Sequence, residues 1–138
     1  MVLSVGVSAA GCSASLPRAP ASAHTEDELV EVPFPPPVVR SDVVPPRPND
    51  AAVWVDGEWV WQVSRWSWHR GAWVVPPAGA TFARWETQRR GAQVLHAPSV
   101  FHLVDGGSVA PADLEEGQGK RRPTVPCAPP ASSTLAVP

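Results

Sequence analysis

The chain has no tyrosine, one methionine and two cysteines among its 138 residues. Cys12 and Cys127 lie near opposite ends, so they form no compact metal-ligand set, and a disulfide between them would enclose little core. No apolar run after Ser13 reaches the ~18 residues that a membrane-spanning helix needs. Glycine-rich phosphate loops and dinucleotide-binding fingerprints are absent as well. The sequence therefore predicts neither a transmembrane protein nor a nucleotide-dependent enzyme.

Strong charge of either sign is also lacking. The formal net charge is −2, and the longest basic run is Lys120-Arg121-Arg122. Nucleic-acid binding needs a basic patch or stripe, and a three-residue run is usually a solvated loop. We therefore expect no nucleic-acid partner, and no motif in the chain calls for a cofactor.

Proline and tryptophan are abundant, and they occupy different parts of the chain. Nine of the 18 prolines lie from Pro17 to Pro48, and all seven tryptophans lie from Trp54 to Trp85. Proline-rich stretches favour an extended backbone, and although similar stretches are ligands of SH3-like modules, a semi-rigid spacer is the favoured interpretation here. We expect a signal-like segment (1–11), a proline-rich tether (12–50), a tryptophan-rich sheet domain (51–104) and a disordered tail (105–138).

The tryptophan-rich segment has the alternation of antiparallel strands. Trp59-Val60-Trp61 and Trp66-Ser67-Trp68 each place two indoles on one side of a strand. Asp56-Gly57 is a strong signal for a two-residue hairpin turn, and Arg70-Gly71 is a weaker one. A third turn is expected at Val63-Ser64, where the residue types suit a tight turn poorly; a four-residue loop from Gln62 to Arg65 would keep the same Trp61–Trp66 pairing. This spacing predicts a four-stranded meander.

The three turns fix which residues are cross-strand partners. The expected tryptophan pairs are Trp54–Trp59, Trp61–Trp66, Trp59–Trp68 and Trp68–Trp73. Cross-strand partners share a face, so six tryptophans would collect on one side of the sheet. Such a side can be the core of a small domain or a platform for an extended glycan; the core is favoured, because a small domain needs its largest side chains inside. The candidate ligand-binding residues are Trp54, Trp59, Trp61, Trp66, Trp68 and Trp73.

Further strands are expected downstream of the tryptophan segment. A hairpin about Arg90-Gly91 and a strand over 100–104 would supply apolar residues that can cover the indoles. The expected fold is all-β, a small antiparallel meander of about four to seven short strands with a disordered proline-rich N-terminal arm and C-terminal tail.

Two groups of polar residues deserve comparison with catalytic or metal sites. Glu58 and His69 are cross-strand neighbours in the expected register and could act as an acid–base pair, but exposed charged pairs on sheets are usually without function. His96 and His102, with His69 or Asp105, could be imagined as zinc ligands, yet their spacing matches no compact ligand motif. The sequence predicts no catalytic residues and no metal site.

The tryptophan segment also contains a repeat. "WVDGEW" (54–59) and "WHRGAW" (68–73) both read W-x-x-G-x-W. In this pattern the chain resembles the WXXGXW-repeat (YXWGXW-repeat) proteins, which are small bacterial envelope lipoproteins with tandem tryptophan and glycine hairpins. The resemblance implies a cell-envelope location and a hairpin architecture rather than an activity.

The first residues, "MVLSVGVSAAGCS", agree with this resemblance. Ala9-Ala10-Gly11-Cys12 places small residues before a cysteine, as in a lipoprotein signal whose cysteine carries the lipid. A basic n-region does not precede it; a start further upstream would account for that, and an apolar terminus without a signal is the alternative. If Cys12 is lipidated, Ser13 rather than Asp after it implies an outer-membrane lipoprotein that faces the periplasm.

Taken together, these features predict a non-catalytic, lipid-anchored cell-envelope protein. Its tryptophan-rich sheet would serve structural or cell-wall contact, with the membrane as partner through Cys12 and peptidoglycan or another glycan as a further candidate partner. The alternative is a periplasmic or secreted module that binds glycan or protein. A metal-dependent enzyme that uses Glu58 and His69 is a third and more distant alternative.

Overall fold

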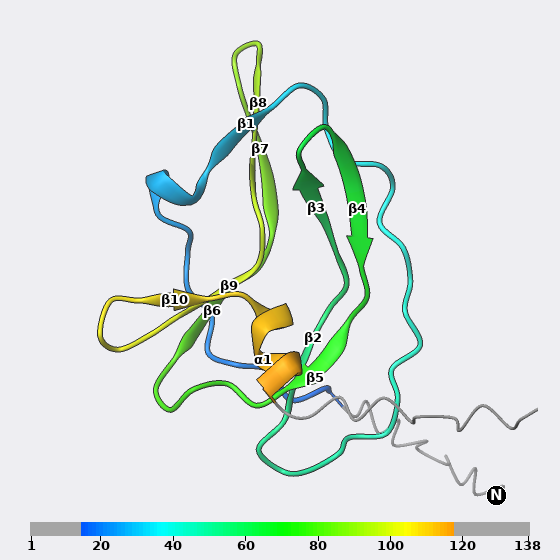
Figure 1. Cartoon of the computed structure of the whole chain (residues 1–138), viewed down its shortest axis with the longest axis vertical. Helices are drawn as coiled ribbons and strands as arrows, with labels where there is room; N and C mark the ends of the chain where they lie inside the picture. Colours follow the sequence, from blue (N-terminus) through cyan, green and yellow to red (C-terminus); the bar gives the residue numbers. More distant parts are fainter. Residues whose placement is uncertain (1–14, 118–138) are drawn as a thin grey trace, which may run out of the picture.

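The computed structural model describes residues 15–117, and these form small antiparallel sheets with little helix (Figure 1). This confirms the all-β fold class. No helix in the described part is long and apolar enough to span a membrane. The elements in chain order are η1 (Glu26–Glu28), β1 (Val30–Val32), β2 (Val53–Val55), β3 (Glu58–Gln62), β4 (Arg65–His69), β5 (Ala72–Val74), β6 (Thr81–Ala83), β7 (Glu86–Arg90), β8 (Gln93–Ala97), β9 (Val100–His102), β10 (Ser108–Val109) and α1 (Pro111–Gly117).

Residues 53–74 form one long two-stranded ribbon, which we call the tryptophan hairpin. β3 pairs with β4, and β2 pairs with β5 in the same continuous register. The ladder is interrupted only where Asp56-Gly57 faces Arg70-Gly71. The six tryptophans form three edge-to-face cross-strand pairs with ring centroids 5.2–5.4 Å apart, namely Trp54–Trp73, Trp59–Trp68 and Trp61–Trp66.

This arrangement corrects the expected meander. The predicted pairs Trp61–Trp66 and Trp59–Trp68 are confirmed, but the predicted pairs Trp54–Trp59 and Trp68–Trp73 are wrong. The reason is that Asp56-Gly57 and Arg70-Gly71 are not turns; the chain continues through both in nearly the same direction. The indoles therefore line a two-stranded ribbon, not one face of a four-stranded sheet.

The turn that does form is the one whose residue types suit it least. Val63 has a φ of 56°, in the left-handed region that valine rarely adopts, and its side chain is fully exposed. The Ser64 N–H donates to the Gln62 carbonyl at 2.6 Å, the bond of a γ-turn. The register of the tryptophan pairs, rather than the local turn preference, thus decides where this hairpin reverses.

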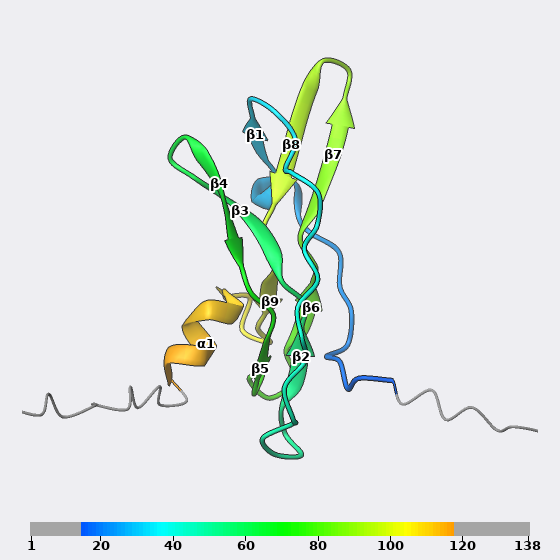
Figure 2. The ribbon, with the colours of Figure 1, turned by 90° about the vertical axis from the view of Figure 1, so that its right-hand side faces the viewer.

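The second half of the domain builds two three-stranded sheets, in the orders β1-β8-β7 and β10-β9-β6. The β7–β8 hairpin confirms the turn expected about Arg90-Gly91, with Gly91 at a φ of 62°, and β9 confirms a strand near Val100. Figure 2 shows the β3–β4 and β7–β8 hairpins standing beside each other. The β10-β9-β6 sheet, which we call the lower sheet, packs against the base of the tryptophan hairpin. The main core between them consists of Phe101, Phe82, Val74, Val55 and Ala80.

The N-terminal segment is not a tether from residue 15 onward. The Trp54 N–H donates to the Pro17 carbonyl at 2.9 Å, the Phe82 N–H donates to the Pro20 carbonyl at 2.7 Å, and β1 is an edge strand of the β8 sheet. The expectation of a loose arm is wrong here, because proline carbonyls can accept bonds even though proline donates none.

Part of the expected tail is also folded. β10 pairs with β9, and α1 follows it and packs near β5. The segments 1–14 and 118–138 lie outside the described residues, and with them lie Cys12 and Cys127.

Candidate functional site

The proline-rich residues 33–48, which we call the proline strap, run along the tryptophan hairpin (cyan in Figure 1). Three indole N–H groups of the hairpin donate to three main-chain carbonyls of the strap. These bonds are Trp66 Nε1 to Phe34 O at 3.3 Å, Trp59 Nε1 to Val38 O at 3.1 Å and Trp73 Nε1 to Pro45 O at 2.8 Å.

This geometry follows from the chemistry of the two partners. An extended proline-rich chain has carbonyls that no ladder uses, and an indole N–H is a donor that needs a partner when it is partly buried. Aromatic-lined grooves bind proline-rich chains in the same manner, because the preformed extended conformation costs little entropy to fix. The hairpin and the strap therefore satisfy each other's polar groups.

Two glycines of the W-x-x-G-x-W repeat form a notch beneath the strap. The Gly71 N–H donates to the Asp42 carboxylate at 2.9 Å. A Cβ atom on Gly57 would collide with that carboxylate and with the Trp68 ring, and a Cβ atom on Gly71 would lie 2.6 Å from the Trp54 ring. Neither glycine has a positive φ. Close approach, not backbone conformation, requires glycine at both positions, which we call the glycine notch.

The indoles are largely covered. Trp54 is 3% and Trp59 5% exposed, while the other four hairpin tryptophans are half-buried. The Trp54 indole N–H donates to the Asp56 carboxylate at 3.0 Å, and the Arg40 guanidinium lies over the Trp59 ring, 4.8 Å from its centroid. Of the six candidate ligand-binding residues, the structure thus places two inside the domain and four at its half-open edges.

Asp56 lies within the first W-x-x-G-x-W motif, and its carboxylate holds the N-terminal segment against the tryptophan hairpin. Its carboxylate accepts from Arg18 at 2.7 and 3.1 Å and from Arg84 at 3.4 Å. The hydrogen bond from Arg18 lowers the pKa of Asp56 below its usual value, against a smaller opposing effect of burial. An aspartate that sequence reasoning assigned to a turn is therefore an ion-pair centre.

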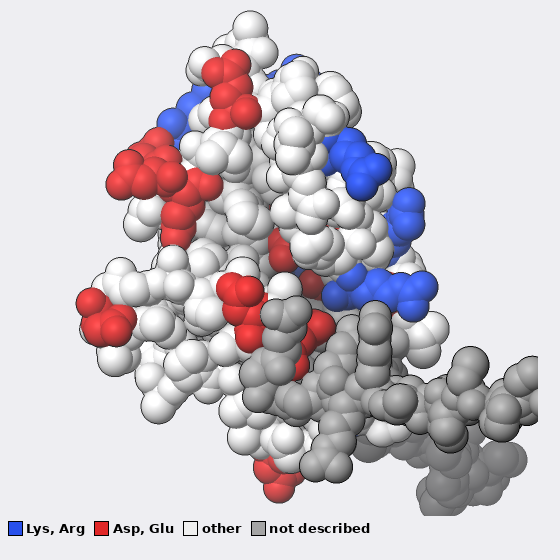
Figure 3. Space-filling view, viewed as in Figure 1, with Lys and Arg blue, Asp and Glu red and all other residues white. Residues whose placement is uncertain are grey.

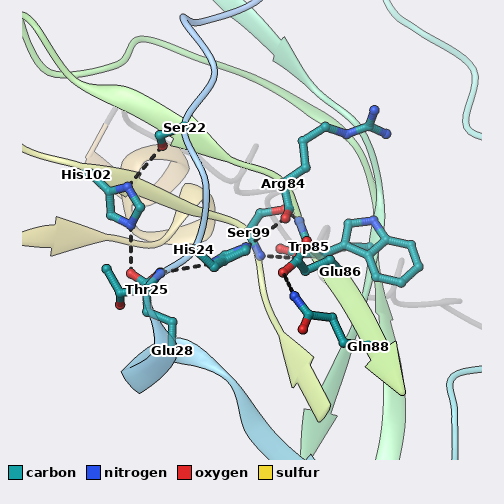
Figure 4. Close-up of polar contacts among 11 residues, drawn as sticks. Ser22, His24, Thr25, Glu28, Arg84, Trp85, Glu86, Gln88, Ser99 and His102 are labelled. Atoms are coloured by element: carbon teal, nitrogen blue, oxygen red, sulfur yellow. Dashed lines mark hydrogen bonds and ion pairs between the residues drawn. The ribbon is translucent and has the colours of Figure 1, made fainter. Parts of the chain in front are cut away.

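A second polar group joins the N-terminal segment to β9 (Figure 4). The Ser22 hydroxyl is hydrogen-bonded to His102 Nδ1 at 3.0 Å, and His102 Nε2 to Glu28 at 2.7 Å. The other Glu28 oxygen bonds His24 at 2.9 Å, whose far nitrogen reaches the Arg84 carbonyl at 2.7 Å. Sequence reasoning missed this group, because its members are separated by most of the domain and follow no periodic pattern.

The order hydroxyl–imidazole–carboxylate is the one with which hydrolases activate a serine. Here the surroundings favour a structural role. The Ser22 N–H, which could otherwise polarise a substrate carbonyl, already donates to Phe82 O at 2.9 Å. Burial raises the pKa of Glu28, but the Thr25 N–H and the two histidines outweigh it, so the net pKa is lowered. An ionised Glu28 thus holds η1 against the lower sheet.

Glu58 and His69 are neighbours across β3 and β4, as predicted. The expectation that both are exposed is wrong for Glu58, which is 7% exposed because the corner between β8 and β9 covers it. Its carboxylate accepts the Ser99 N–H at 2.7 Å, and burial raises its pKa. His69 bonds the Gln62 side chain at 3.2 Å. The two residues line a cavity of about 300 Å³ together with Pro111 and Glu115.

The histidines considered as zinc ligands do not meet. His96 is 1% exposed and presents its ring to Trp66 at a centroid distance of 4.7 Å, whereas His102 belongs to the Glu28 group. Neither His96 nitrogen has a partner within ordinary hydrogen-bonding distance. Burial lowers its pKa to about 4, although the nearby Glu86 backbone opposes the shift. Within residues 15–117 no three histidine, cysteine or acidic side chains are placed to hold a metal ion.

Charge is unevenly distributed over the surface. Figure 3 shows acidic side chains around η1 and α1, and basic side chains both on the opposite side, beside the tryptophan hairpin, and next to η1, where Arg90 pairs with Glu26. Comparison with protein-family models, curated proteins and solved structures finds no match for this chain.

Proposed function

We propose that the protein is a non-catalytic, lipid-anchored component of the bacterial cell envelope, in which the tryptophan hairpin is a structural element. The observation that carries this proposal is the set of hydrogen bonds between hairpin and strap. Three indole N–H groups of the hairpin donate to carbonyls of the same chain. The lipoprotein-like run that ends at Cys12 and the W-x-x-G-x-W repeat support the location.

The position of the first folded residues sharpens this proposal. The chain is bound to the domain from Pro17 and Arg18 onward. An extended chain rises at most about 3.6 Å per residue, so Cys12 can be only about 18 Å from Pro17. A lipid on Cys12 would hold the domain close to the membrane surface rather than away from it on a long arm.

Metabolic labelling with palmitate tests the anchor. With the gene expressed from its own upstream sequence, we expect label and membrane association for the wild type and for the control Cys127→Ser, and neither for Cys12→Ser. Equal labelling of the wild type and Cys12→Ser would refute the lipid anchor.

The alternative function, a periplasmic or secreted module that binds glycan or protein, has one observation in its favour. Cavities of about 370 and 450 Å³ flank the strap near Asp42, and the indoles of Trp54 and Trp68 reach them. Tryptophan fluorescence tests this alternative. A glycan module would show a saturable change on addition of soluble peptidoglycan fragments, whereas the structural role predicts no change.

A further inference from the structure

The strap is held by three main-chain carbonyls, by the Asp42 carboxylate and by a few other side chains, while most of its apolar side chains face solvent. Val38 is 88% and Val43 94% exposed, and Phe34 is half exposed. No backbone–backbone hydrogen bond joins residues 33–48 to another described residue. The strap's contacts with the rest of the domain include the three indole bonds, the Asp42 bond in the glycine notch, the Arg40 cation–π contact, the edge-to-face contact of Phe34 with Trp61 at a centroid distance of 5.3 Å, and the bond from the Arg47 guanidinium to the Ala52 carbonyl at 3.0 Å. The indole bonds recognise an extended backbone whatever its side chains are, and the side-chain contacts add a carboxylate, an aromatic ring and guanidinium groups.

The packing beneath the strap is incomplete. The two cavities of about 370 and 450 Å³ both have Arg40 and Asp42 in their walls, so open space lies on either side of the strap where it crosses the notch. Segments with few buried apolar contacts open locally at low cost in free energy. Lifting the strap would expose the Trp59, Trp66 and Trp73 donors together with the notch.

We propose that the tryptophan hairpin is a binding site for an extended, proline-rich polypeptide segment that carries a carboxylate. The strap is its resident intramolecular occupant, and a matching segment of a partner protein displaces it. The indole N–H groups bind the carbonyls of the incoming chain, and the glycine notch takes its carboxylate. Arg70 lines the notch cavity and adds positive charge there.

The way the strap is attached determines how this site behaves. β1 pairs with β8 on one side of the strap and β2 pairs with β5 on the other. The strap can therefore lift but cannot leave, and it competes at an effective concentration of about millimolar or higher. We expect the intact protein to bind a free segment weakly, and a weakened strap to unmask a tighter site.

A labelled peptide with the sequence of residues 33–48, PFPPPVVRSDVVPPRP, is the probe. Its binding to the full-length chain is followed by fluorescence anisotropy, and the site is identified by shifts of the Trp59, Trp66 and Trp73 indole signals in NMR spectra. We expect Asp42→Ala in the protein to tighten binding at least tenfold. Val43→Ala, a matched change at an exposed strap residue, should leave the affinity at the wild-type value.

The peptide itself provides a second arm. Asp42→Asn within the peptide should weaken its binding to the Asp42→Ala protein, because the notch then receives no carboxylate. If the Asp42→Ala protein does not fold, Arg40→Ala weakens the strap through the Trp59 contact instead.

Three results would overturn the proposal. The first is a folded Asp42→Ala protein that binds no peptide, or binds it no more tightly than the wild type. The second is binding that shifts none of the three indole signals. The third is a dimer of the Asp42→Ala protein that the peptide does not dissociate, since the site would then belong to another copy's strap.

Discussion

At the scale of single residues, the two glycines of the repeat carry the most specific structural information. Gly57 and Gly71 are needed because the Asp42 carboxylate and two indole rings approach their Cα atoms closely. We expect Gly57→Ala to lower the free energy of unfolding by about 1–3 kcal/mol, the usual cost of overpacking, in urea titrations. The control is Gly107→Ala, where φ is not positive and an added Cβ would meet only the exposed Asp105 side chain and, at the ordinary contact distance of 3.5 Å, Leu103; it should change the free energy of unfolding by less than about 0.5 kcal/mol.

His96 makes stability depend on pH. Its pKa is about 4 in the folded protein, below the ordinary 6.5, so between these values only the unfolded chain takes up a proton. Stability is full above pH 6.5 and is lost as the pH falls toward 4, by about 3 kcal/mol at 1.36 kcal/mol per unit. His96→Phe should remove this loss in urea titrations across the window. An unchanged acid dependence in the variant would contradict the assignment.

Glu58 acts in the opposite direction. Burial raises its folded pKa above the ordinary 4.5, so its contribution is full below pH 4.5 and is lost as the pH rises through the folded pKa. Glu58→Gln keeps an acceptor for the Ser99 N–H without the buried charge. We expect the variant to be more stable than the wild type at pH 7 and to show no advantage at pH 4; lower stability at pH 7 would show that the carboxylate is needed there.

At the scale of elements, the sequence predicted the strands of the tryptophan hairpin but not all of their partners. The alternation of tryptophans, with a turn at Val63-Ser64, placed Trp61 opposite Trp66 and Trp59 opposite Trp68. No other register pairs both sets of indoles. The Asp56-Gly57 dipeptide was interpreted as a turn because glycine there has two possible causes, positive φ or close approach, and local sequence does not distinguish them. The distinguishing atoms belong to Asp42 and Trp68, which are distant in the chain.

The β3–β4 turn offers a stabilising change. Val63 has a φ of 56° and is fully exposed, so its side chain contributes strain and no packing. Val63→Gly should raise the free energy of unfolding by about 1 kcal/mol, since relief of the left-handed conformation outweighs the entropy of glycine. Ser64→Gly is the matched control, because Ser64 has no positive φ, and it should give no gain. Thermal unfolding by circular dichroism measures both.

At the scale of the whole molecule, the proline-rich segment from residue 15 to residue 48 is part of the fold. The prolines within residues 33–48 predicted an extended chain, and the strap is extended in the structure. What composition could not reveal is the donor set that holds it, since Trp59, Trp66 and Trp73 appear in the sequence only as sheet residues. The Ser22–His102–Glu28 group was missed for the same reason, because nothing local links residues so far apart.

The central claim is that the chain's own strap closes the tryptophan hairpin. NMR of the indole N–H groups in the full-length protein tests it most directly. The account predicts slowly exchanging signals for Trp59, Trp66 and Trp73, with nuclear Overhauser contacts to Val38, Phe34 and Pro45 respectively. Rapid solvent exchange of these three indole protons, without contacts to the strap, would contradict it.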